Sequence, residues 1–172
     1  TNGSVDQNMG YFKAGVFTIG GQSVLISRTG WTGELGYEIY TLGKNTDCKR
    51  LWNELIHSGK KYGMVFSSMQ AMNIRRIEAG ILDSGSDFDA SMGPDEAGLH
   101  GFVDKDKKYF IGQEAINKRN RDNRIHGVLT GSYIPKSGDL VHDGNKALGY
   151  VTTGAYSPAF EAGIGYVRFN LA

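Results

Sequence analysis

The stretch from Ile26 to Tyr40, I-S-R-T-G-W-T-G-E-L-G-Y-E-I-Y, constrains the fold of this chain more than any other part of its sequence. Gly30, Gly33 and Gly36 recur at every third position. Such spacing predicts a backbone that bends into positive φ or is approached closely by another group. The residues after Gly33 alternate between two faces, as expected for a strand. The stretch is therefore predicted to be a strand, a glycine-rich turn and a second strand.

The same turn carries an aromatic ring and a carboxylate. Trp31 offers a flat surface on which a ring can stack, and Glu34 can accept two parallel hydrogen bonds from a planar N–C–N edge. Pterins, purines and guanidinium groups all present such an edge. A tight hairpin with a solvated Glu34 is the alternative, because glycine-rich turns are common.

Charge and cysteine content exclude several classes of protein. A net charge of +1 and a pI near 7.8 give no electrostatic reason to expect nucleic acid or an anionic membrane as a partner. No apolar run approaches the roughly 18 residues of a membrane span, and no signal peptide opens the chain. The single cysteine, Cys48, excludes an internal disulfide and favours a reducing, cytoplasmic location.

The motifs of self-sufficient catalytic sites are absent from the sequence. It contains neither a P-loop nor G-x-G-x-x-G, and its four histidines are widely separated. Cys48 falls on the apolar stripe of a predicted helix, where a thiol is inert. We therefore predict no catalytic residue and no metal ligand in this chain.

Periodicity predicts an α+β fold in which an antiparallel sheet has two helices on one face. Residues 14–19 and 23–29 are predicted strands joined at Gly20-Gly21. A helix capped by Asn45 or Thr46 is predicted from an apolar stripe at helical spacing, with Trp52 in the core; the stripe consists of Cys48, Leu51, Trp52, Leu55 and Ile56. Residues 67–79 form the second predicted helix.

The second half of the chain divides by charge. Residues 83–96 hold five acids and no bases, and the spacing fails the calcium-loop pattern, so a solvated loop is expected. A short helix is predicted at 111–117, before a charged linker at 118–124. Residues 125–172 follow as short strands with turns between them, the pattern of a small β-barrel. We therefore expect one partial α+β domain over 1–120 and a truncated C-terminal barrel domain over 121–172.

Four segments in the same order resemble the glycine-cleavage T-protein family, whose members are tetrahydrofolate-dependent aminomethyltransferases. They cover most of residues 24–167 and read G-W-T-G-E-L-G-Y-E-I (30–39), I-R-R-I-E-A-G-I-L (74–82), F-I-G-Q-E-A-I (110–116) and Y-V-T-T-G-A-Y-S-P-A-F-E-A-G-I-G-Y-V (150–167). The resemblance implies the family's folate-binding fold, with tetrahydrofolate as cofactor and a small-molecule or lipoyl-protein donor of the carbon.

The resemblance also assigns roles to particular residues. It implies that Glu34 reads the pterin edge, that Trp31 and Tyr37 form walls of the pocket, and that Arg76 holds or orients the folate. The neighbouring Arg75 would by spacing form a surface pair with Glu78. In most family members an acid beside folate N5 comes from the N-terminal half.

The four segments are expected to belong to the C-terminal half of the family's proteins, which makes this chain a fragment. A fragment lacking half of the pocket is expected not to turn over. Its sheet would have an exposed edge and an apolar face. Self-association, or pairing with a separate N-terminal chain, is therefore expected.

Departures from the family pattern leave two other functions open. Ala71-Met72-Asn73 stands where T-proteins carry A-R-D, which moves the sequence toward folate-dependent demethylases of sulfonium or methoxy compounds, such as dimethylsulfoniopropionate demethylase. Residues 107–114 resemble K-G-C-Y-x-G-Q-E of a non-catalytic folate-binding protein for iron–sulfur assembly. Tyr109 occupies the position of its cysteine, which argues against that function.

Overall fold

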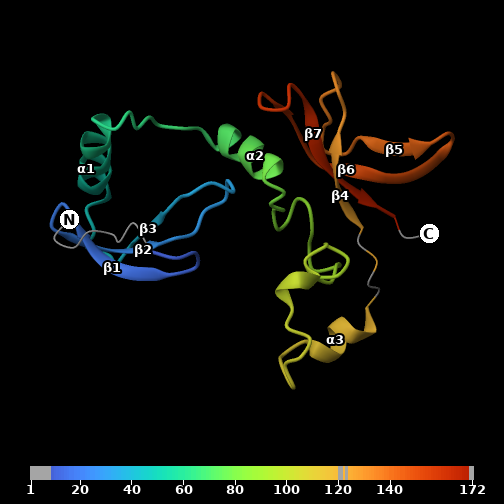
Figure 1. Cartoon of the computed structure of the whole chain (residues 1–172), viewed down its shortest axis with the longest axis horizontal. Helices are drawn as coiled ribbons and strands as arrows, with labels where there is room; N and C mark the ends of the chain where they lie inside the picture. Colours follow the sequence, from blue (N-terminus) through green and yellow to red (C-terminus); the bar gives the residue numbers. More distant parts are fainter. Residues whose placement is uncertain (1–8, 120–121, 123, 171–172) are drawn as a thin grey trace. The chain divides into compact units, whose positions relative to one another are not determined.

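The computed structural model describes residues 9–119, 122 and 124–170. Contacts divide the chain into two compact units, Thr1–Arg75 and Arg76–Ala172, each of which we describe by itself (Figure 1). No helix among the described residues has the length and hydropathy needed to cross a membrane. Part of the predicted linker, at 120, 121 and 123, and residues 1–8 lie outside the described residues. The domain boundary expected at 120/121 stays a prediction.

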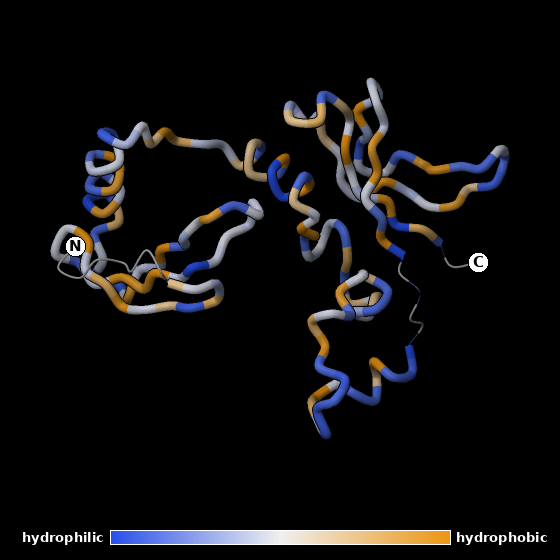
Figure 2. The backbone as a smooth tube through the Cα atoms, viewed as in Figure 1, coloured by the Kyte–Doolittle hydropathy of each residue, from blue (hydrophilic) through white to orange (hydrophobic). Residues whose placement is uncertain are grey.

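The first unit contains a three-stranded antiparallel sheet. Strands β1 (Ala14–Ile19), β2 (Gln22–Ser27) and β3 (Glu38–Thr41) pair in that order. The φ angles of +55° at Gly20 and +76° at Gly21 confirm the predicted hairpin turn, since these values suit glycine. Apolar stretches lie along β1 and β2 in the tube of Figure 2.

Helix α1 (Cys48–Lys60) covers one face of this sheet. Asp47, rather than Asn45 or Thr46, caps it by accepting the Arg50 N–H at 2.9 Å. The core of the unit joins residues of the sheet to one side of the helix, namely Ile19, Val24, Ile26 and Leu51, with Phe17, Ile39 and Leu55 packed around them.

Two expectations about α1 are wrong. Trp52 is 49% exposed and meets Phe66 edge to face with ring centroids 5.8 Å apart. Cys48 is exposed as well. The sheet contacts the line of Leu51 and Leu55, one turn apart. Trp52, about 100° further round the helix, therefore lies at the edge of the stripe.

Helix α2 (Met69–Glu78) crosses the division between the units, and the remaining elements belong to the second unit. A 3-10 turn, η1 (His100–Phe102), and helix α3 (Gln113–Lys118) precede a second sheet. Its antiparallel strands pair in the order β4-β7-β6-β5, with bounds β4 (Ile125–Leu129), β5 (Leu140–Asp143), β6 (Lys146–Ser157) and β7 (Ala162–Phe169).

The α+β class is confirmed, with two antiparallel sheets, but two details of the prediction are wrong. The second sheet is open in the described part of the chain, with β4 and β5 at its edges, because four strands are too few to enclose a packed interior. The predicted second helix does not share the core of the first sheet. Ile77 of α2 instead packs into the core of the second unit, beside Ile164 and Tyr166.

The acidic segment 83–96 is not a solvated loop as expected. Asp87 is fully buried and Glu96 is 5% exposed. Glu96 accepts the Gly93 N–H at 2.8 Å, and it lies 3.5 Å from a guanidinium nitrogen of both Arg119 and Arg124. These basic residues come from outside the segment, which is why its own composition gave no sign of them.

The Glu96 contacts predict a loss of stability in acid. The Gly93 N–H, aided by both arginines, holds the pKa of Glu96 below its usual value. The folded state therefore binds fewer protons than the unfolded state, and the stabilisation is complete only above the unfolded pKa of about 4.3. It is lost as pH falls through the lower, folded pKa. In urea titrations at several pH values, Glu96→Gln should reduce the fall in the free energy of unfolding at acid pH. Glu114→Gln, at an exposed position of α3, should leave that fall unchanged. The same acid dependence of the free energy of unfolding in both variants would contradict this role of Glu96.

Candidate functional site

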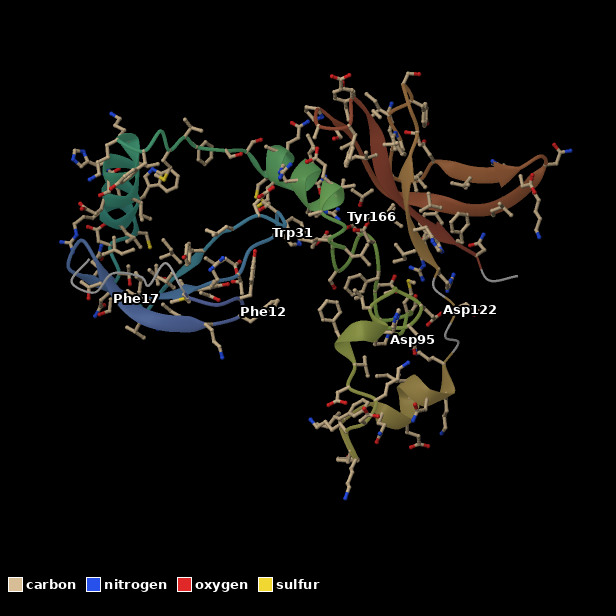
Figure 3. All side chains as sticks on the ribbon, in the orientation of Figure 1. Phe12, Phe17, Trp31, Asp95, Asp122 and Tyr166 are labelled. Carbon is tan, nitrogen blue, oxygen red and sulfur yellow. The ribbon has the colours of Figure 1, made fainter. Side chains whose placement is uncertain are left out.

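The predicted glycine-rich turn borders a depression of about 680 Å³ in the first unit. Trp31, in the loop between β2 and β3 (Figure 3), and Tyr37, just before β3, both line it. That they form walls of a folate pocket stays a prediction. Met72 of α2 contributes to the same lining from outside the turn. The other lining residues are Thr29, Gly30, Thr32, Gly36 and Glu38.

The three glycines of the turn serve different purposes. Gly33 has a φ of +73°, which confirms the predicted bend. A Cβ on Gly30 would meet no atom within 4 Å, and one on Gly36 would make only ordinary contacts at 3.8 Å. Neither is required by the chain's own packing. Because both line the depression, their missing side chains leave its surface open to a flat ligand.

Glu34 is not itself a lining residue, but in the sequence it lies between Thr32 and Gly36, which are. Its side chain is 67% exposed. Its Oε1 accepts a hydrogen bond from Nη2 of Arg75, which is 43% exposed. Arg75 therefore pairs with Glu34 across 41 positions of sequence. Glu78 accepts a hydrogen bond from the Ser157 hydroxyl at 2.5 Å. Its expected pairing with Arg75 stays a prediction.

Arg76 occupies a buried polar cluster in the second unit. Its Nη1 donates to Oδ2 of Asp87 at 2.6 Å and to the Ile81 carbonyl at 3.0 Å. Its Nη2 donates to the Thr153 hydroxyl at 3.2 Å. The side chains of Arg76 and Asp87 are 2% and 0% exposed, so the guanidinium is held by the interior of its own unit.

Asp87 is the centre of this cluster. Its Oδ1 accepts hydrogen bonds of 2.7 Å from both Thr152 and Thr153, and its Oδ2 accepts the Asp83 N–H at 2.8 Å. Two strand hydroxyls, a backbone donor and a guanidinium therefore share one carboxylate. The cluster joins α2, the acidic segment and strand β6.

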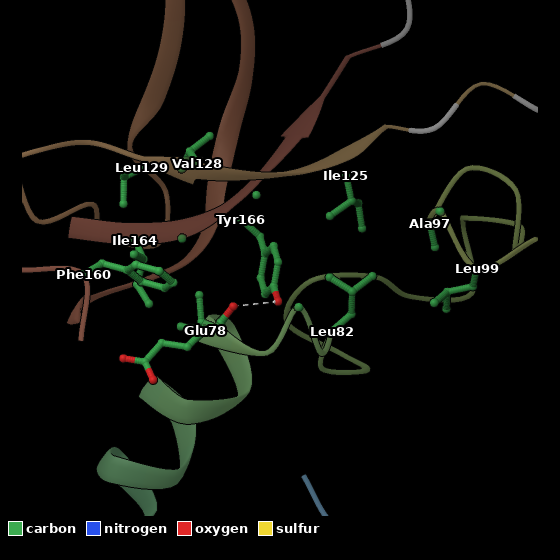
Figure 4. A pocket seen from close by; sticks show the side chains of 15 residues that line it. Glu78, Leu82, Ala97, Leu99, Ile125, Val128, Leu129, Phe160, Ile164 and Tyr166 are labelled. Atoms are coloured by element: carbon green, nitrogen blue, oxygen red, sulfur yellow. Dashed lines mark hydrogen bonds between the residues drawn. The ribbon is translucent and has the colours of Figure 1, made fainter. Parts of the chain in front are cut away.

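A second depression, of about 550 Å³, lies in the second unit and is mostly apolar (Figure 4). Tyr166 and Phe160 face it, and the Tyr166 hydroxyl donates to the Ile77 carbonyl at 3.3 Å. Burial raises the pKa of Tyr166 to about 12, so its proton stays in place. Glu78, the one carboxylate of the lining, already accepts the Ser157 hydroxyl. The first depression combines two aromatic rings with Thr29, Thr32 and Glu38, the mixture of apolar and polar groups typical of ligand sites.

Sequence reasoning missed three residues of these sites. Met72 was noted only as a departure from a motif, although it lines the first depression. Asp87 was assigned to solvent, and Arg28, whose guanidinium lies over the Tyr37 ring, was not singled out. The adjacent Arg75-Arg76 pair was the available sign of a buried arginine, and so of a buried carboxylate partner such as Asp87. Neighbouring helix positions point about 100° apart, so only one of these two arginines can face a core.

Comparison with known proteins identifies the family of this chain. Residues 2–107 match the family model described as the GCVT N-terminal domain. The match covers more than half of the chain, and the chain therefore belongs to the GCVT family.

The relatives within this family are aminomethyltransferases. The chain is 39% identical over 159 residues to the aminomethyltransferase of Caldanaerobacter subterraneus subsp. tengcongensis, covering 90% of this chain and 42% of that protein. It is 38% identical over 161 residues to that of Halothermothrix orenii, covering 90% and 44%. The crystal structure of glycine cleavage system aminomethyltransferase T from Bartonella henselae has the same fold, with a TM-score of 0.72 at 24% identity, over 85% of this chain and 41% of that one.

These matches correct the expected position within the family. The chain spans less than half the length of these relatives. The matching model is that of the N-terminal domain, whereas the motifs predicted the C-terminal half. The motifs at 30–39 and 74–82, which were assigned to the C-terminal half, lie within the matched residues.

Proposed function

We propose that this chain takes part in tetrahydrofolate-dependent one-carbon transfer of the aminomethyltransferase type. The observation that carries the proposal is the depression bordered by the glycine-rich turn, with two aromatic walls and an exposed carboxylate in the same short segment. Membership of the GCVT family and the names of the relatives support it.

The residues of the turn fit a planar, hydrogen-bonding cofactor. The open surface at Gly30 gives room for a flat ring, and Trp31 and Tyr37 provide faces for it. Glu34 could accept hydrogen bonds from a pterin N–C–N edge, with the hydrogen bond from Arg75 orienting the carboxylate. Tetrahydrofolate, when bound, supplies a nucleophilic N5. The chain's own contribution is to bind, orient and shield the ring.

Arg76 is assigned a different kind of role from the one expected for it. Its side chain is 2% exposed and bonded to Asp87, which favours an indirect role in supporting the fold around the site. Direct contact between Arg76 and the cofactor stays a prediction.

Replacing Glu34 by glutamine should weaken tetrahydrofolate binding by more than about tenfold, because a charge-assisted pair in a ligand site is lost. Titration calorimetry with tetrahydrofolate, on the full-length protein with the rest of the pocket present, measures the change. Glu54→Gln, an exposed carboxylate on α1 of the same unit, is the matched control and should leave the affinity unaltered. Equal affinities of wild type and Glu34→Gln would reduce Glu34 to a turn residue.

The folate product identifies the reaction. Incubation with tetrahydrofolate and an aminomethyl-lipoyl protein should yield methylene-folate if the transfer is of the aminomethyl type. Methyl-folate formed from a sulfonium or methoxy donor would instead establish the demethylase alternative. Because the chain covers 42% of the length of the first relative, these assays should use the full-length protein, in which the rest of the pocket is present.

Self-association also stays a prediction. The sheet face opposite α1 carries a cross-strand row of Val16, Leu25 and Tyr40, of which Val16 is 66% and Tyr40 47% exposed. Such a row favours a partner surface over this face.

A further inference from the structure

Arg28 lies between two tyrosine rings where β2 leads into the glycine-rich turn. Its guanidinium carbon is 4.8 Å from the centroid of the Tyr11 ring and 5.6 Å from that of the Tyr37 ring. Both distances fall within the range of about 6 Å over which a cation is attracted to an aromatic face. A planar guanidinium stacks on rings in a way that the compact ammonium of lysine does not. We call Tyr11, Arg28 and Tyr37 the Arg28 sandwich.

The arginine itself is firmly placed. Its Nη1 donates to the Met9 carbonyl at 2.5 Å, and its backbone N–H donates to the Lys13 carbonyl at 2.8 Å. Its Nε is buried and finds no acceptor among the described residues. Leaving a buried donor unsatisfied is unfavourable, so hydrogen bonding alone does not explain an arginine here. The contacts with the two rings supply the missing reason.

The turn that carries Tyr11 is strained. Phe12 has a φ of +60°, which is uncommon for a bulky side chain, yet the residue is 82% exposed and gains no burial from it (Figure 3). The Phe12 N–H donates to the Arg28 carbonyl at 3.1 Å. Backbone strain of this kind persists where the surrounding structure imposes it, often near functional sites. Its effect here is to fix Tyr11 against Arg28.

We propose that Arg28 is a positioning residue for the depression of the first unit, holding the Tyr37 ring where a planar ligand meets it. Tyr37 is 37% exposed, so core packing does not fix its ring. The Arg28 guanidinium instead holds the Tyr37 ring at one of its two faces. The other face remains available to the ligand. This inference rests on the proposed function, in which the planar ligand is tetrahydrofolate.

The first test compares two replacements of Arg28 in the full-length protein by calorimetric titration with tetrahydrofolate. Arg28→Met, which keeps the length but loses charge and plane, should weaken binding about fivefold. Arg28→Lys should recover part of the loss because it restores the cation. Lys13→Met removes an exposed cation just before the neighbouring strand β1 and should have no effect. An unchanged affinity in Arg28→Met, or equal losses in Arg28→Met and Lys13→Met, would overturn the proposal.

The second test needs no ligand and separates the sandwich from the proposed function. The Nε–H resonance of Arg28 should be shifted upfield by the rings in the ¹⁵N spectrum of the free chain. Tyr37→Leu should reverse part of that shift, whereas Trp52→Phe, on α1, should not. A resonance unmoved by Tyr37→Leu would refute the sandwich. Absence of tetrahydrofolate binding by the full-length wild-type protein, with the shift present, would refute the proposed function and with it the ligand assignment.

Discussion

Replacing Arg76 by methionine should lower the free energy of unfolding of the second unit by about 3–5 kcal/mol. The change leaves the carboxylate of Asp87, which is 0% exposed, buried without its counter-charge. It also removes donors to the Ile81 carbonyl and the Thr153 hydroxyl. Because these contacts join α2 to strand β6, the loss should appear as faster amide exchange throughout β6.

Arg75→Met is the control for this experiment, since it changes the same residue type one position earlier on the same helix. The Arg75–Glu34 pair is exposed at 43% and 67%, so solvent screens it and its loss should cost less than about 1 kcal/mol. Urea denaturation monitored by amide exchange reports the stability of each unit separately. Equal losses in the two variants would show that Arg76 is not a buried structural residue. A fully stable Arg76→Met with weakened folate binding would restore the role implied by the family resemblance.

Local patterns predicted the first unit well. Strand β1 has the bounds predicted from alternation, and α1 begins at Cys48 as its stripe indicated. The error lay in which part of the stripe faces the sheet. Periodicity places Leu51 and Trp52 on the same broad face, but it does not say where the neighbouring sheet contacts that face. That choice depends on partners distant in the sequence.

The candidate site was predictable where it is contiguous. Trp31, Glu34 and Tyr37 fall within seven positions of one turn, so their types and spacing could be read together. The Arg76 cluster could not be found in this way, because Arg76 and Thr153 are 77 positions apart. An acidic segment is ordinarily solvated, and only the fold reveals that Asp87 lies opposite an arginine. The open sheet was missed for the same reason, since closure depends on pairing between distant strands.

Replacing Gly163 by alanine should cost the second unit about 3 kcal/mol, the other large effect expected here. A Cβ at this position of β7 would lie 1.8 Å from the Tyr133 carbonyl oxygen and 2.4 Å from the Thr130 hydroxyl. The obstructing carbonyl belongs to backbone rather than to a flexible side chain. The Gly163 N–H also donates to the Gly131 carbonyl at 2.8 Å, so the strand cannot retreat without losing that bond.

Glycine at position 163 leaves the space in which the buried Pro135 packs on the sheet. A Cβ on Gly154 of β6 would come within 2.0 Å of the Pro135 carbonyl oxygen, and one on Gly163 within 2.9 Å of the Pro135 ring. Pro135 is among the fully buried side chains, so these glycines let the loop between β4 and β5 pack directly on the sheet. Gly127→Ala, on β4 of the same sheet, meets no atom within 4 Å and should stay within about 0.5 kcal/mol of wild type. Thermal unfolding of the two variants decides the matter: comparable midpoints would mean that the loop shifts freely and that Pro135 needs no glycine beneath it.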